Sequence, residues 1–118
     1  MTVKRIVANM LTVEPGLAKP FYGSIFDMHP VMDHGWIQTY AAEGDPAGPQ
    51  LGFASEGGSG TPVPDLSIEV DDLEAILRKV RAAGLPIEYG PVEEPWGVRR
   101  FFLRDPFGRL VNVLSHPR

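Results

Sequence analysis

Two β-prone runs joined by a turn motif constrain the C-terminal part of the chain most strongly. Residues 98–103 and 110–114 are rich in β-branched, aromatic and leucine residues, and Asp105-Pro106-Phe107-Gly108 lies between them. Asp at the first position, Pro at the second and Gly at the fourth are typical of a type I turn. This stretch therefore predicts a β-hairpin.

A strand and a helix precede this hairpin. Apolar and polar residues alternate from 65 to 70, which is typical of a half-buried strand. Apolar residues at 73, 76, 77 and 80 then form one stripe of a helix. Asp71 or Asp72 is suited to cap its start, and Gly84 is suited to end it.

The first half of the chain contains the same order of elements. A β-prone N-terminal run leads to a helix start at Glu14-Pro15, and Pro20 predicts that this helix is short or kinked. Further strands follow, separated by turns and loops rich in Gly and Pro. The expected strands are 3–13, 26–32, 35–41 and 50–55, and the expected loops are 43–49 and 56–64.

A short strand is also expected at 87–89, between the helix and the hairpin, so the order β-α-β-β-β occurs twice. We predict an α+β protein with one domain, 1–118, made of a module 1–55, a Gly-rich linker 56–63 and a module 64–118. The sequence has no cysteine, which excludes disulfides and thiolate chemistry. Its net charge of −4 argues against nucleic acid as a partner. No secretory signal or membrane segment is visible, so a cytoplasmic location is expected.

The C-terminal motif resembles one known family. This part of the chain resembles the vicinal oxygen chelate superfamily. The resemblance lies in four successive features: Pro95-Trp96-Gly97, a strand rich in arginine and aromatic residues, the turn Asp-Pro-x-Gly, and a closing strand. That superfamily contains glyoxalase I-like, extradiol dioxygenase-like and bleomycin-resistance-like proteins. The resemblance covers nearly the whole chain and implies that two βαβββ modules form a curled mixed sheet around a concave pocket.

Strand alternation then predicts which residues face this pocket. In the second module Val111 and Val113 are expected under the helix. In the first strand Leu11 and Val13 are expected under the first helix. Single aromatic residues fit an ordinary core as well, but rings and methionine also suit planar organic ligands. The predicted ligand-binding residues are Met10, Trp36, Tyr40, Phe53, Asp65, Ser67, Trp96, Phe102 and Asn112.

The resemblance also implies where a metal would be held. The ligand positions of metal-dependent members fall on Ala8, Asp65, Asn112 and a residue near Phe53. Alanine cannot ligate, and a neutral amide is a poor replacement for a carboxylate on a transition metal. We therefore predict no metal and no cofactor. The alternative is a site built from His29 and His34 with Asp27 or Asp33.

No catalytic residue is assigned. Asp65 and Glu69 are candidates for general base and acid, or for holding a cationic group on a ligand. Arg99 or Arg100 is expected to neutralise one of them.

The leading functional hypothesis is metal-independent sequestration of an aromatic or cationic small molecule, as the bleomycin-resistance branch implies. That branch also implies a homodimer, in some members with modules exchanged between chains. The alternative is an enzyme: a metal-dependent glyoxalase-like lyase or isomerase, or an extradiol-type dioxygenase. A third hypothesis is a metal-free enzyme in which Asp65 or Glu69 acts as the general base.

Overall fold

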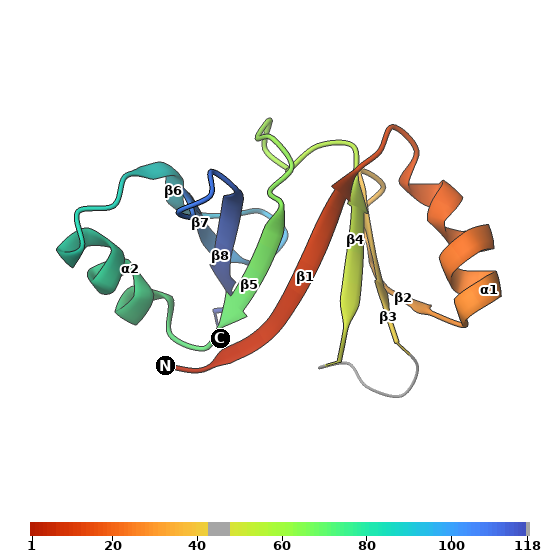
Figure 1. The fold of residues 1–118 in the computed structure, drawn as a ribbon, viewed down its shortest axis with the longest axis horizontal. Helices are drawn as coiled ribbons and strands as arrows, with labels where there is room; N and C mark the ends of the chain where they lie inside the picture. The colour runs from red at the N-terminus through yellow and green to blue at the C-terminus, as the bar shows by residue number, and fades with distance from the viewer. Residues whose placement is uncertain (43–47, 118) are drawn as a thin grey trace. The chain divides into compact units, whose positions relative to one another are not determined.

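The chain folds into two compact units in a computed structural model that describes residues 1–42 and 48–117 (Figure 1). Unit 1 comprises Met1–Ile6 and Pro64–Arg118, and unit 2 comprises Val7–Val63. Part of the predicted loop 43–49 lies outside the described residues. The α+β class and the repeated β-α-β-β-β order are confirmed. Across the described residues, no helix is both long and apolar enough to span a membrane.

Unit 1 is a sheet with one helix on it. Strand β5 pairs with β8 in parallel, and β8 pairs with β7 and β7 with β6 in antiparallel fashion. Strand order in this unit is β1-β5-β8-β7-β6. Helix α2 covers one side of these strands (Figure 1). The elements are β5 (Leu66–Val70), α2 (Leu73–Ala82), β6 (Ile87–Glu93), β7 (Arg99–Arg104) and β8 (Leu110–Ser115), with the first residues of β1 (Val3–Leu11).

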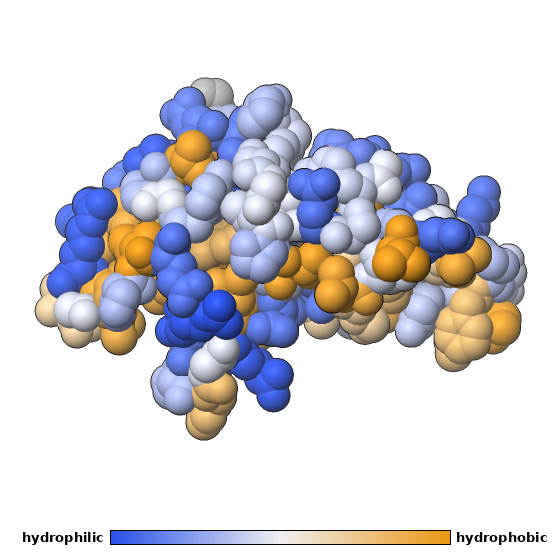
Figure 2. All heavy atoms as spheres, turned by 90° about the horizontal axis from the view of Figure 1, so that it is seen from above, coloured by the Kyte–Doolittle hydropathy of each residue, from blue (hydrophilic) through white to orange (hydrophobic). Residues whose placement is uncertain are grey.

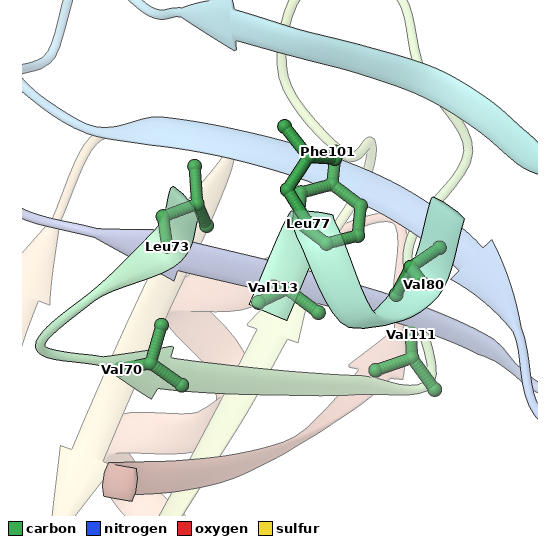
Figure 3. Close-up of a cluster of buried hydrophobic side chains, with 7 residues drawn as sticks. All are labelled: Val70, Leu73, Leu77, Val80, Phe101, Val111 and Val113. Carbon is green, nitrogen blue, oxygen red and sulfur yellow. The ribbon is translucent and has the colours of Figure 1, made fainter. Parts of the chain in front are cut away.

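Helix α2 forms as its sequence predicts. The Asp72 side chain accepts a hydrogen bond of 3.1 Å from the Ala75 N–H, which satisfies one free donor of the first turn. Gly84 follows the helix with a φ of +70°, a conformation that glycine adopts without strain. The apolar stripe packs onto the sheet and forms the main core, drawn in Figure 3: Val70, Leu73, Leu77, Val80, Phe101, Val111 and Val113.

The hairpin of β7 and β8 has the predicted turn. The Gly108 N–H donates to the Asp105 carbonyl at 3.1 Å, as a four-residue turn requires. Oδ1 of Asp105 also accepts from the N–H groups of Phe107 and Arg109, both at 2.9 Å. The turn residues thus fix the register in which Arg104 pairs with Leu110.

Unit 2 has the same plan with an irregular helical stretch. The predicted short or kinked helix is confirmed, because the stretch contains 3-10, π and α segments in succession. Strand β1 pairs with β4 in parallel, and β4 with β3 and β3 with β2 in antiparallel fashion. The elements are η1 (Pro15–Leu17), η2 (Lys19–Gly23), α1 (Ser24–Phe26), β2 (His29–Asp33), β3 (Ile37–Ala41) and β4 (Gln50–Ala54).

The predicted facing of the first strand is wrong by one residue. Phe53 packs with Ala18 and Tyr22 of the helical stretch, and Met10 pairs with Phe53 in the register of β1 and β4. Met10 therefore lies on the helix side, whereas Leu11, predicted there, is 75% exposed. Val13, also predicted under the helix, follows the strand and is 91% exposed.

The physical reason is the amide of Asn9. The register places Asn9 beside Gly52, and a Cβ on Gly52 would collide with Oδ1 of Asn9. The missing side chain of Gly52 thus makes room for a polar group on the face opposite the helical stretch. The expected facing would instead have packed this amide under the helix, which costs free energy unless hydrogen bonds replace its hydration.

Candidate functional site

The candidate site is the face of the unit 1 sheet opposite α2, which we call the distal face. Phe101 and Val111 pack under α2. Because side chains alternate along a strand, their neighbours Phe102 and Asn112 point to the distal face. Ser67 lies beside Asn112 in the parallel register of β5 and β8. The facing predicted for the second module is therefore confirmed.

Asn112 lies at the centre of the distal face. It pairs with Ser67 on one side and with Phe102 on the other. Its side-chain Nδ2 donates to Oγ of Ser67 at 3.1 Å. Asn112 is only 6% exposed, and its Oδ1 has no hydrogen-bond donor among the described residues. A buried acceptor of this kind is uncommon in folded proteins.

Asp65 has a structural role in this arrangement. Its Oδ2 accepts a hydrogen bond of 2.8 Å from the Leu110 N–H, and its own N–H donates to the Leu110 carbonyl at 2.8 Å. These bonds join the start of β5 to the start of β8. The carboxylate is therefore engaged with backbone at the edge of the distal face.

The Glu69 carboxylate contacts two basic side chains. Its Oε1 lies 3.1 Å from Nε of Arg5, and its Oε2 lies 3.0 Å from Nδ1 of His116. The expectation that Arg99 or Arg100 neutralises Asp65 or Glu69 is wrong. The Arg99 Nε lies 2.9 Å from Oε1 of Glu74 on α2. Arg99 thus points to the helix side of the sheet, and Arg100 has a different carboxylate partner.

Arg100 forms a buried ion pair with Glu94. Its Nε donates to Oε2 of Glu94 at 2.7 Å, and the Tyr89 hydroxyl donates to the same oxygen at 3.1 Å. The two charged side chains are 4% and 3% exposed. Charge-assisted bonds in such a dry environment are strong, and losing either partner leaves a buried charge.

Three rings surround the Arg100 guanidinium, and we call them the aromatic cage. Its central carbon lies 5.4 Å from the ring centre of Tyr89, 4.9 Å from Trp96 and 4.8 Å from Phe102. Cations are attracted to the faces of such rings. Trp96 and Phe102, predicted to bind a ligand, therefore already contact a cation of the chain itself.

Sequence reasoning did not find this cluster. Arg100 was expected to pair with Asp65 or Glu69, and no role was predicted for Glu94. The spacing of these two residues on either side of Pro95-Trp96-Gly97 is the signal that was available. The Glu94 N–H donates to the Val98 carbonyl at 2.7 Å across that turn. This short loop brings the two strands, and hence the two charges, together.

Three of the predicted ligand-binding residues lie on the side of the unit 2 sheet that faces the helical stretch: Tyr40, Phe53 and Met10. Tyr40 and Phe53 are buried in the core under the helical stretch of unit 2, and Met10 is on the same side. The Tyr40 hydroxyl donates to Oε1 of Gln38 at 2.9 Å. Burial raises the pKa of the Tyr40 phenol, and the nearby Asp33 carboxylate raises it further. The structure thus gives these rings core positions.

The alternative metal site, built from His29 and His34 with Asp27 or Asp33, is not formed among the described residues. The His34 ring stacks on Trp36 at 5.9 Å between ring centres, which also places the predicted Trp36 beside the turn of β2 and β3. Asp33 accepts from the Gly35 N–H at 2.8 Å, as a turn residue. Among residues 1–42 and 48–117, no three histidine or carboxylate side chains are grouped so as to hold a metal ion.

A family model matches residues 6–113 of this chain. It describes the Glyoxalase/Bleomycin resistance protein/Dioxygenase superfamily. The chain belongs to this superfamily. None of the curated proteins matches it.

Solved structures share the fold of this superfamily member at low identity. A protein from Vibrio splendidus, described as a member of the same superfamily, is 15% identical with a TM-score of 0.67, covering 98% of this chain and 100% of its own. Methylmalonyl-CoA epimerase from Mycobacterium tuberculosis is 18% identical with a TM-score of 0.64, covering 98% and 88%. A Legionella pneumophila structure described as NAD-dependent benzaldehyde dehydrogenase is 17% identical with a TM-score of 0.72, covering 95% and 99%.

The residues present do not fit the metal that some superfamily members use. At the positions implied by the resemblance, Ala8 has no donor and Asn112 offers an amide bonded to Ser67. Phe53 is core, and the Asp65 carboxylate accepts from backbone. Transition metals favour imidazole, thiolate or several carboxylates.

Proposed function

We propose that this protein binds a small, neutral aromatic molecule at the distal face without a metal ion. The observation that carries the proposal is Asn112. The resemblance implies a metal-binding glutamate at this position, but the residue is a neutral asparagine. Its amide is hydrogen-bonded to Ser67, and Phe102 is its cross-strand neighbour. One polar group beside a ring is the usual composition of a site for an organic ligand. The biological consequence we propose is sequestration, as in the resistance branch.

The distal face favours an aromatic ligand over a cationic one. A cation would compete with Arg100 for the rings of Trp96 and Phe102. The carboxylate of Glu69, which was expected to attract a cation, is already paired with Arg5 and His116.

Elemental analysis combined with tryptophan-fluorescence titration tests this proposal. We expect no stoichiometric metal in the purified protein and micromolar binding of a planar aromatic compound, about 8 kcal/mol, unchanged by chelators. The Trp36→Phe variant should keep the fluorescence change and the Trp96→Phe variant should lose it. Trp96 belongs to the aromatic cage of Arg100, which also contains Phe102 of the distal face. Retention of stoichiometric metal, or turnover that requires one, would instead assign the chain to the lyase, isomerase or dioxygenase class.

We also propose that the protein is a homodimer that associates through the helical stretch of unit 2. Leu17, Phe21, Ile25 and Phe26 are each at least 50% exposed. The rings of Phe21 and Phe26 lie next to each other, with 5.7 Å between their centres. Figure 2 shows apolar surface in the region where Figure 1 draws α1. Contiguous exposed apolar side chains mark association sites.

Light scattering coupled to size-exclusion chromatography measures this association. We expect the native protein to elute with the mass of a dimer and Phe21→Glu with the mass of a monomer, because a buried unpaired carboxylate opposes association. Phe107→Glu is the matched control, since Phe107 is 84% exposed at the turn of β7 and β8. A monomeric native protein, or equal effects of both substitutions, would contradict this interface.

A further inference from the structure

Helix α2 ends in an exposed surface that combines apolar and basic residues. The Leu85 N–H donates to the Val80 carbonyl at 3.1 Å, which fixes the chain just after the helix. A leucine at this place often packs back onto the last turn, yet Leu85 is 48% exposed. We call this surface the α2 end, and its residues are all exposed: Arg78, Arg81, Ala82, Leu85 and Pro86.

The α2 end carries positive charge without a counter-charge. Arg78 and Arg81 form no ion pair among the described residues. They lie three residues apart on the helix, so they share one side of it with Ala82. Arg81 lies in the last turn, where a cation favours the helix dipole, but Arg78 lies before that turn. Helix stability therefore does not account for both arginines.

The helical stretch of unit 2 has acidic residues at its ends. Glu14 precedes the stretch and Asp27 follows it, and both are exposed and have no ion pair within residues 1–42 and 48–117. In the sequence, residues 7–63 contain six acidic side chains and one basic side chain, Lys19. Because the whole chain has a net charge of −4, the acidic excess lies in unit 2. Two helical stretches that faced each other would thus bring like charges together.

We propose that the helical stretch of one chain packs on the α2 end of a second copy. This inference rests on the proposed homodimer and deepens it, because it names the surface that covers the exposed apolar side chains of the stretch. Those side chains meet Leu85, and Arg78 and Arg81 then lie beside the carboxylates at the ends of the stretch. In a two-fold symmetric dimer each chain gives its stretch to one contact and its α2 end to the other, so the contact forms twice.

Complementation between two variants tests this contact. Phe21→Glu introduces an unpaired carboxylate and Leu85→Lys an unpaired ammonium, so each variant alone should have the mass of a monomer in chromatography with light scattering. An equimolar mixture of the two variants should have the mass of a dimer. One contact of that mixed dimer is native on both sides, and in the other the introduced carboxylate and ammonium face each other.

The matched control for Leu85→Lys is Phe107→Lys, which changes a more exposed residue of unit 1 and should leave the dimer intact. Urea unfolding verifies that the variants are folded. If Leu85→Lys stays dimeric, or if the mixture stays monomeric, the role of the α2 end is overturned while the homodimer stands. If the native protein is a monomer, or if Phe21→Glu dimerises as the native protein does, the inference and the proposed homodimer are both overturned.

The salt dependence of the native dimer provides a second test. Salt screens the attraction between opposite charges, so we expect the dimer dissociation constant to rise at least about 3-fold between about 0.05 M and about 0.5 M NaCl. Sedimentation equilibrium measures this constant. Arg78→Gln combined with Arg81→Gln should remove most of the dependence. A constant that stays the same or falls as salt is added would overturn the charge pairing, because stretches that face each other repel less in salt.

Discussion

Glu94→Ala is expected to lower the free energy of unfolding by about 3–5 kcal/mol, because it leaves the Arg100 guanidinium buried without its counter-charge. The two side chains are almost completely buried, and the Tyr89 hydroxyl loses its acceptor at the same time. The cation–π contacts with the aromatic cage remain, but they do not replace a carboxylate. Equilibrium urea unfolding at neutral pH measures the effect.

Glu74→Ala is the matched control for this prediction. Glu74 also pairs with an arginine, but its side chain is 53% exposed and that of Arg99 is 30% exposed. Exposed pairs contribute about 0–1 kcal/mol, so a small change is expected. The double substitution Glu94→Leu with Arg100→Met should recover much of the loss, because no unpaired charge is left. Equal effects of Glu74→Ala and Glu94→Ala would show that the buried pair is not the cause.

Phe101→Ala is expected to lower the free energy of unfolding by about 3–5 kcal/mol through the cavity that it creates. Phe101 has no exposed surface and belongs to the same core cluster as Leu77 of α2 and Val113 of β8 (Figure 3). Thermal and urea unfolding both report the loss.

Phe107→Ala provides the comparison with the same chemical change. Phe107 is 84% exposed at the tip of the hairpin, so its truncation should alter the free energy of unfolding by no more than about 0.5 kcal/mol. A loss for Phe101→Ala as small as this would contradict the packing of α2 on the sheet.

The second module could be predicted closely because its signals are local and agree with one another. The strand 65–70 has apolar residues of one parity only, and the helix after it has a cap, a stripe and a terminating glycine. Asp105 to Gly108 determine the turn and hence the register of the hairpin. Once α2 packs on the parity of Val111, Asn112 has to face the other way.

The first module could not be predicted in the same way because β1 has apolar residues on both parities. Val7 and Leu11 alternate with Ala8 and Met10, so a period of two does not decide which set is buried. The decision comes from the neighbouring strand, where Gly52 leaves room for Asn9 and Phe53 packs under the helical stretch. That information lies more than forty residues away in the sequence.

The charged residues of the site show the same division. The rings at 96 and 102 and the amide at 112 became candidate residues through their residue type, their place in the predicted strands and turn, and the family resemblance. The ion-pair partner of Arg100 was not predicted, because an arginine with a glutamate six residues earlier resembles an ordinary pair of surface charges. Only the folding of β6 and β7 around the Pro95-Trp96-Gly97 turn removes both from water.

The element order, helix α2 and the hairpin turn follow from the sequence alone. These properties depend on neighbours within a few residues, and local sterics and periodicity specify them. The facing of β1, the burial of Glu94 with Arg100 and the unpaired oxygen of Asn112 follow from the tertiary structure. Each of these depends on which atoms from distant segments exclude water, and burial is a property of the packed chain.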